Sequence, residues 1–335
     1  MPFNRKLLGD LRPNQIITTF GPGSIVDAVK DSVTILDTSY WKDRGKKIID
    51  GRLASYLGVD CFYMPRTSAN WGDVPVVSFP YTHICSKCGR LFDIRDDFDL
   101  EKYLSLGARC PECGWSAYPS RFITICENGH MDDFPWSWWV HRGNDGCDGV
   151  LKINSSGDTS TLADMHVRCT KCNAWRSMSG ATQKENFEGM VCRGHHPFRP
   201  HARNERCGKQ LIPSQRGASN VYFPVSRSAI SIPPWINPLF NLIDEHLRDI
   251  ELARTLMGDA GVSRIYELYF QAYSRADFDA ALERRLNNIT EFKEIKQMEY
   301  DAITHHNDPS YASNKKHFKA EEENLPDYLK PYFSR

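Results

Sequence analysis

The distribution of cysteine constrains the fold of this chain more than any other feature. All 11 cysteines of the 335 residues lie between Cys61 and Cys207, and several are paired as Cys-x-x-Cys. The first residues, MPFNRKLLGDLRP, lack the apolar core of a secretory signal, so we expect a cytoplasmic protein whose thiols stay reduced. Paired thiols in a reducing compartment indicate metal ligands rather than disulfides.

Two Cys-x-x-Cys-Gly turns form the first candidate metal site. Two intervening residues let both sulfurs of a turn face one ion, and the glycine after each pair suits a backbone of positive φ. Two such turns brought together give the closed four-thiolate site of a zinc ribbon. The four predicted zinc ligands are Cys85, Cys88, Cys110 and Cys113.

A second site is predicted from one further pair and two single cysteines. Its four thiolate ligands are Cys169, Cys172, Cys192 and Cys207. The alternative is a site in which an imidazole replaces one thiol, because three histidines lie close by in the sequence. These are His195, His196 and His201.

A third site would combine two thiolates with two imidazoles. The ligands that spacing indicates are Cys126, His130, His141 and Cys147. The alternative is a buried free cysteine with surface histidines, since free cysteine is often simply buried. Cys61 has no partner in this scheme, and we expect it to be a core residue.

All three sites would have four protein ligands, so none would leave an open position for water or substrate. The chain also lacks the HExxH pair of zinc proteases and the Gly-Lys-Ser/Thr of phosphate-binding loops. We therefore expect structural zinc and no ATPase activity.

The formal charge of zero hides two segments of opposite sign. Residues 91–135 carry nine acidic and four basic side chains, whereas 161–220 carry ten basic and four acidic ones. Basic residues crowded beside the last cysteines predict contact with the DNA backbone, since phosphate attracts them without regard to sequence. The alternatives are an acidic protein partner or internal pairing with 91–135. The predicted DNA-contacting residues are Arg193, Arg199, Arg203 and Arg206.

Three tryptophans and two aspartates lie within the ten residues 132–141. Such rings can stack on nucleic-acid bases, but a small domain short of aliphatic residues more often buries them as core. The adjacent aspartates, Asp132 and Asp133, would point to opposite faces of a strand rather than share one metal ion.

The pattern along the chain predicts an α+β fold. Residues 1–80 form a small α/β unit with a hairpin of strands at 24–29 and 32–37, and 81–150 form a zinc-ribbon region with the mixed site. Residues 151–235 hold the second zinc module and return strands, since the alternation of apolar residues predicts a strand or two within 221–232. Apolar residues at helical spacing, with Arg284 and Arg285 outward, predict a helical region over 236–335. Apolar runs are too short to span a bilayer.

Three long strings carry a family resemblance. They are RPNQIITTFGPGSIVD at 12–27, CENGHMDDFPW at 126–136, and SNVYFP with SAISIPPW across 219–235. On these strings the chain resembles the DrmB family, the accessory subunits of DISARM phage-defence systems. Members usually continue into a further carboxy-terminal domain, so no function located there is carried over.

The resemblance implies a non-catalytic zinc-binding subunit that works beside a helicase and contacts invading DNA. Two other functions are kept as alternatives. One is a metal-dependent nuclease of the HNH kind, which would use His195, His196 and Asn204. The other is a zinc adaptor that binds only proteins.

Overall fold

The computed structural model describes residues 10–28, 31–41, 45–64, 74–96, 100–144, 146–155, 161–232, 235–287 and 291–305. Strands and helices are both present, with helices alone following residue 235 among the described elements, so the predicted α+β class is confirmed. The chain divides into a first unit of 1–44 and 66–226 and a second unit of 45–65 and 227–335. No described helix is long and apolar enough to cross a membrane.

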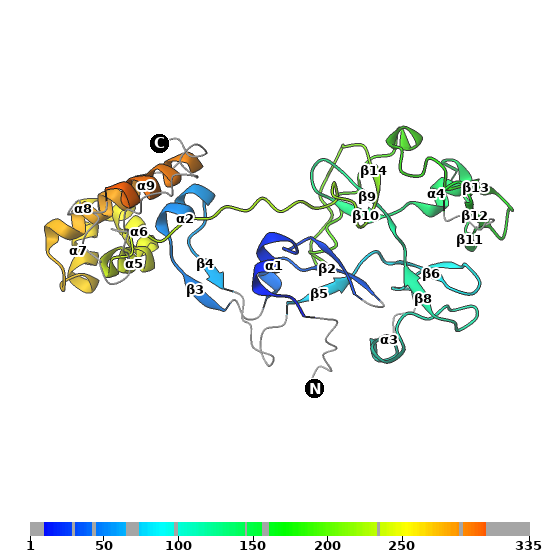
Figure 1. Cartoon of the computed structure of the whole chain (residues 1–335), viewed down its shortest axis with the longest axis horizontal. Coiled ribbons are helices and arrows are strands. Elements are labelled where there is room, and N and C mark those ends of the chain that lie inside the picture. Colours follow the sequence, from blue (N-terminus) through cyan, green and yellow to red (C-terminus); the bar gives the residue numbers. More distant parts are fainter. Residues whose placement is uncertain are drawn as a thin grey trace, which may run out of the picture. The chain divides into compact units, whose positions relative to one another are not determined.

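The first unit begins with a short helix and a three-stranded antiparallel sheet of order β1-β2-β5 (Figure 1). Helix α1 starts at Pro13, where a missing N–H costs no hydrogen bond. The predicted hairpin is present, with Ile25 opposite Thr34, although Val29 and Lys30 lie outside the described residues. These elements are α1 (Pro13–Thr18), β1 (Ile25–Asp27), β2 (Ser32–Ile35), η1 (Thr38–Tyr40) and β5 (Val76–Ser78).

Three small antiparallel sheets carry the cysteine region. Their strand orders are β7-β6-β8, β10-β9-β14 and β11-β12-β13. The strands are β6 (Thr82–Cys85), β7 (Leu91–Asp93), β8 (Ala117–Pro119), β9 (Phe122–Ile125), β10 (Met131–Asp133), β11 (Leu151–Ser155), β12 (Met165–Cys169), β13 (Trp175–Ser177) and β14 (Ile212–Gln215). The helices between them are α3 (Leu100–Leu106), α4 (Trp136–His141) and η2 (Lys184–Phe187).

Aromatic rings form the core beneath these sheets, as predicted. Trp139 is fully buried, and its ring stacks on Phe187 with centroids 5.3 Å apart. Trp136 is also buried, while Trp138 packs against the cluster from its edge. The two aspartates of β10 diverge: Asp133 accepts from the backbone N–H of Thr82, and Asp132 pairs with Arg193.

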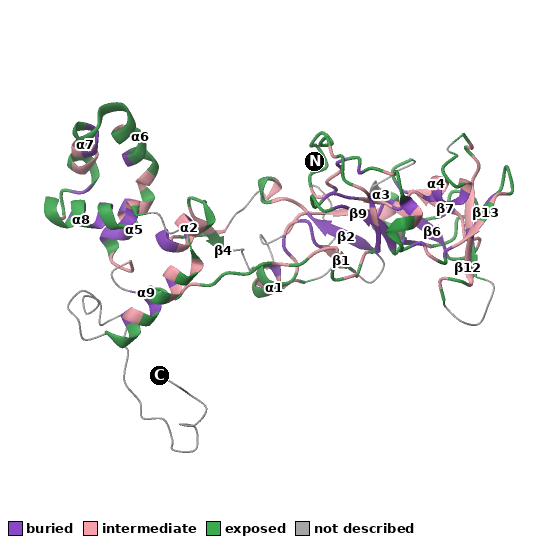
Figure 2. Ribbon diagram, turned by 90° about the horizontal axis from the view of Figure 1, so that it is seen from above, coloured by how far each residue is buried: buried purple, intermediate pink, exposed green. Residues whose placement is uncertain are grey.

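The second unit joins a two-stranded antiparallel sheet, and the helix between its strands, to the carboxy-terminal helices. The pattern along the sequence assigned 45–65 to the α/β unit of 1–80, but in the structure this segment clusters with 227–335. Its elements are β3 (Lys46–Ile48), α2 (Gly51–Leu57), β4 (Phe62–Met64), α5 (Pro238–Glu245), α6 (Leu247–Met257), α7 (Asp259–Tyr269), α8 (Arg275–Leu286) and α9 (Phe292–Thr304). Buried residues occur on each of α5 to α9 (Figure 2).

Buried ion pairs and backbone contacts hold this second unit together. The guanidinium of Arg52 is buried and donates to Asp50 and to the carbonyl of Ile230, each at 2.8 Å. Arg285, which helical spacing placed on an outer face, is instead buried and pairs with Asp244. That prediction was wrong because the periodicity of α8 alone does not reveal a carboxylate on α5.

The strand predicted within 221–232 is not formed: that segment of the described chain has no strand. Its alternating apolar residues Phe223 and Val225 are exposed instead. Alternation indicates a strand only where a neighbouring strand supplies backbone partners.

Candidate metal centres

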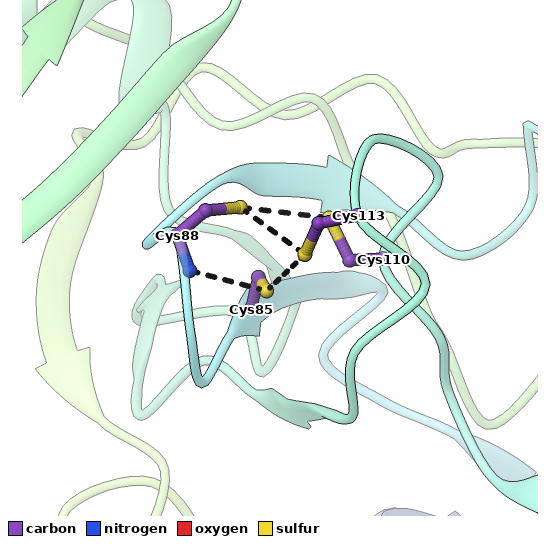
Figure 3. A group of neighbouring side chains, drawn as sticks. All are labelled: Cys85, Cys88, Cys110 and Cys113. Carbon is purple, nitrogen blue, oxygen red and sulfur yellow. Dashed lines mark hydrogen bonds between the residues drawn. The ribbon is translucent and has the colours of Figure 1, made fainter.

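The first cluster brings together the four predicted thiols (Figure 3). The sulfurs of Cys85 and Cys113 are 3.5 Å apart, and those of Cys88 and Cys110 are 3.7 Å apart. A tetrahedron with Zn–S bonds of about 2.3 Å has S–S edges of about 3.8 Å. The spacing therefore fits four thiolates around one zinc ion and is far longer than the ~2.05 Å of a disulfide.

Sheet pairing and two tight turns build this first cluster. Cys85 ends β6 and lies opposite Ala117 of β8, which brings the two Cys-x-x-Cys turns together. Each turn is closed by a glycine of positive φ, Gly89 at 67° and Gly114 at 71°. A Cβ at Gly89 would lie 2.1 Å from the carbonyl oxygen of Ile153, so only glycine fits there.

Backbone amides favour the thiolate form of Cys85. Burial alone would raise the pKa of this thiol, but the N–H groups of Cys88 and Lys87 lie 3.4 Å from its sulfur. Together with neighbouring thiols they lower the pKa of Cys85 to about 7. A thiol that ionises near neutral pH is ready to bind a metal ion.

The second cluster consists of Cys126, His130, Cys192 and Cys207. The Nδ1 of His130 is 3.2 Å from the Cys126 sulfur, and the sulfurs of Cys126 and Cys207 are 4.0 Å apart. On its other side, the His130 Nε2 lies 3.2 Å from a carboxylate oxygen of Glu205. A ligating histidine usually donates its second N–H to such an oxygen, so this ring fits a zinc ligand.

The third cluster consists of His141, Cys147, Cys169 and Cys172. The sulfurs of Cys147 and Cys169 are 3.6 Å apart. The Nδ1 of His141 donates to the carbonyl of Ser137 at 2.8 Å, which leaves Nε2 as an acceptor. That Nε2 is buried with no hydrogen-bond partner in the described structure, as expected of an atom placed to bind a metal ion.

The structure therefore groups the eight ligands of the second and third predicted sites differently from the grouping that their sequence spacing indicated. We expected Cys169 and Cys172 with Cys192 and Cys207, and this pairing was wrong. Instead, Cys126 and His130 lie beside the single cysteines Cys192 and Cys207. His141 and Cys147 lie beside the Cys-x-x-Cys pair of Cys169 and Cys172. None of His195, His196 and His201 belongs to the three tetrads.

Strand register explains the exchange. Leu151 of β11 lies opposite Cys169 of β12, so the chain that enters β11 carries Cys147 to the third cluster. Ile125 of β9 lies opposite Ile212 of β14, so Cys126, just after β9, meets the segment that leads into β14. The third cluster is thus nested in sequence between the two halves of the second.

Several features of the cysteine region differ from what the sequence predicted. Glu205 contacts both His130 and His196, and nothing in the spacing marks it as a partner of a ligand. The turn after Cys172 is closed by Asn173 at φ 60°, not by glycine. Near the second cluster's single cysteines, the glycine of positive φ is Gly194. Cys61 is half-buried rather than a core residue.

The four predicted DNA-contacting arginines are all exposed, but two are already paired. Arg193 lies 2.8 Å from Asp132, and Arg199 lies 3.0 Å from Asp37. Arg203 and Arg206 have no ion-pair partner among the described residues. The internal pairing of the basic segment with 91–135 is therefore real in part, as Lys209 with Glu127 also illustrates at 3.0 Å.

The two histidines of the candidate nuclease site contact different groups. The Nδ1 of His195 lies 3.1 Å from the carbonyl of Met131, whereas the Nε2 of His196 lies 3.1 Å from Glu205. His130, His196 and Glu205 bring their ligand atoms within 4.8 Å of one another. Asn204 is exposed.

The fold and clusters define an α+β protein with zinc-ribbon-like cysteine modules. The chain belongs to the family described as "Domain of unknown function (DUF8724)", whose profile matches residues 12–223. It is also 39% identical over 328 residues to the DISARM protein DrmB of Bacillus paralicheniformis. That alignment covers 92% of this chain and 57% of the relative, so the chain spans little more than half of that protein's length. The resemblance seen in the sequence is confirmed.

Proposed function

We propose that this protein is a non-catalytic, zinc-binding subunit of a DISARM-type phage-defence system, acting in the cytoplasm beside a helicase and in contact with DNA. The three closed Cys/His tetrads carry the proposal, because each supplies four donors to one ion. Similarity to a DISARM protein supports the biological context.

Zinc would act here as a structural cross-link. Each ion would join two segments of the cysteine region, whose sheets have only three short strands each. With four protein ligands, no coordination position is left for water or substrate. Hydrolytic chemistry at these centres is therefore not expected.

The helicase partner would supply ATP hydrolysis, since the chain has no Gly-Lys-Ser/Thr motif. DNA contact is assigned to the four arginines near the second cluster, chiefly to Arg203 and Arg206, whose guanidinium groups lack carboxylate partners among the described residues. Such contacts bind phosphate and weaken as the salt concentration rises.

A nuclease assay separates this function from the alternative of a metal-dependent nuclease. The observation that favours that alternative is the proximity of His196 to Glu205. The purified full chain is incubated with plasmid and Mg²⁺ or Mn²⁺, beside His196→Ala, and assayed for ATPase activity with and without DNA. We expect neither cleavage nor ATP turnover. Cleavage that His196→Ala abolishes, or robust turnover, would refute the proposal. A purely protein-binding adaptor would show no salt-dependent retention on DNA.

A further inference from the structure

The sheet β11-β12-β13 has one buried face and one polar face. Ile153 and Val167 lie opposite each other in β11 and β12, and both are buried in the aromatic core. Successive residues of a strand point to opposite faces, so Lys152 and Arg168 point away from that core. On this polar face Arg168 is exposed and Lys152 is half-buried.

A row of basic side chains crosses this polar face. Lys152 lies opposite Arg168, and Arg168 lies opposite Trp175 of β13. A bridge from Arg90 to Lys152 extends the row by one residue. Directly opposite residues share one face of a sheet, so these four side chains form one surface, which we call the basic sheet face.

The basic sheet face carries more positive than negative charge. The carboxylate of Glu112 lies 2.6 Å from Lys152 and 3.6 Å from Arg90, so one acidic group serves two cations. Arg168 donates to the amide oxygen of Asn173 at 2.7 Å, and no described carboxylate pairs with it. The face therefore suits an anionic partner.

Trp175 gives this face a flat apolar surface. Its side chain is 63% exposed, in contrast to the fully buried Trp139. The ring of His166 approaches it edge-on, with centroids 6.1 Å apart. Three residues before Trp175 is Cys172 of the third cluster, so a bound metal ion would hold the strand that presents the indole. Trp115 lies two residues after Cys113 of the first cluster and is 53% exposed, with the Lys87 ammonium 5.0 Å from its ring centre.

We propose that the basic sheet face binds single-stranded nucleic acid, with a base stacked on Trp175 and phosphates held by Arg168 and Lys152. An exposed indole beside cations is the arrangement that recognises unpaired bases along a phosphate backbone. In a duplex, neighbouring base pairs cover the base faces, so stacking on Trp175 requires a single strand. The inference rests on the proposed DNA contact and moves its main surface away from Arg203 and Arg206.

The test is fluorescence anisotropy of a labelled 20-nucleotide oligo-dT with the zinc-loaded full chain. Stacking contributes about 1–3 kcal/mol per base, so Trp175→Ala should raise Kd about 5- to 150-fold, while Trp175→Phe should stay within about 3-fold. Arg168→Ala should also weaken binding and reduce the salt slope by about 0.7. Arg254→Ala, an exposed charge of the second unit, is the matched control and should leave Kd unchanged.

Zinc content and melting temperature, measured for every variant, separate loss of contact from loss of fold. Preference for oligo-dT over a 20-base-pair duplex, lost in Trp175→Ala, supports the inference. Weakening by Arg203→Ala with Arg206→Ala, and none by Trp175→Ala, would overturn it while leaving DNA contact intact. Absence of any DNA binding by the unaltered protein would instead remove the proposed DNA contact itself. Loss of binding to a partner protein alone in Trp175→Ala would overturn the nucleic-acid assignment.

Discussion

Glu205 lies 3.2 Å from the Nε2 of His130, although 75 residues separate the two in sequence. The other nitrogen of the same ring faces the thiol of Cys126 at 3.2 Å. The carboxylate thus fixes which nitrogen of His130 is free to bind a metal ion.

Glu205→Gln should weaken zinc binding at the second cluster by about 10- to 100-fold, because partners of a ligating histidine tune its basicity and orientation. Titration with a chromogenic chelator measures this effect, because one equivalent of zinc should leave the variant at a lower chelator concentration than it leaves the unaltered protein. Glu188→Gln is a matched control, since Glu188 is exposed and outside the three tetrads. Equal release from both variants would show that Glu205 has no such role.

Cys207→Ser should unmask thiols of its own cluster only. Differential alkylation with mass spectrometry should find Cys126 and Cys192 newly reactive, while Cys147 and Cys169 stay protected. In the reciprocal variant Cys172→Ser, Cys147 and Cys169 should react instead. If Cys207→Ser exposed Cys169, the grouping by sequence spacing would be right after all.

That grouping marks the limit of what the sequence predicts. The first cluster was predictable because both of its halves are complete Cys-x-x-Cys turns, and local turn geometry decides them. The others depend on which strands pair, as when Ile125 meets Ile212, and spacing carries no record of that pairing. The helical region and the tryptophan core followed from periodicity and composition, but the burial of Arg285 depends on Asp244 in another helix.

Replacing a buried tryptophan should lower the free energy of unfolding far more than replacing an exposed one. Trp139→Ala removes a fully buried ring and should lower the free energy of unfolding by about 3–5 kcal/mol. Trp175→Ala removes an exposed ring and should change it by less than about 0.5 kcal/mol. Denaturant unfolding of the zinc-loaded proteins measures both. A large loss from Trp175→Ala would mean that this ring is part of the core.

His83 should make the first unit sensitive to mild acid. Burial lowers the pKa of His83 to about 4, outweighing its contact with the carbonyl of Tyr81. The unfolded chain, with an ordinary pKa of about 6.5, takes up the proton first as pH falls, so stability is lost between about pH 6.5 and pH 4.

From pH 7.5 to pH 5.5 this difference amounts to about 1.4 kcal/mol at 1.36 kcal/mol per pKa unit. For each protein, the free energy of unfolding is compared between pH 7.5 and pH 5.5. The decrease should be about 1.4 kcal/mol larger in the unaltered protein than in His83→Gln. His201→Gln, which alters a solvent-exposed histidine, should keep the full dependence. Identical pH profiles for His83→Gln and the unaltered protein would contradict the assignment.

Elemental analysis of the purified full chain, prepared without chelator, tests the central claim most directly. Three Cys/His tetrads predict about three equivalents of zinc per molecule. Fewer than two equivalents, in protein that is folded by circular dichroism, would contradict an organisation of the cysteine region by metal.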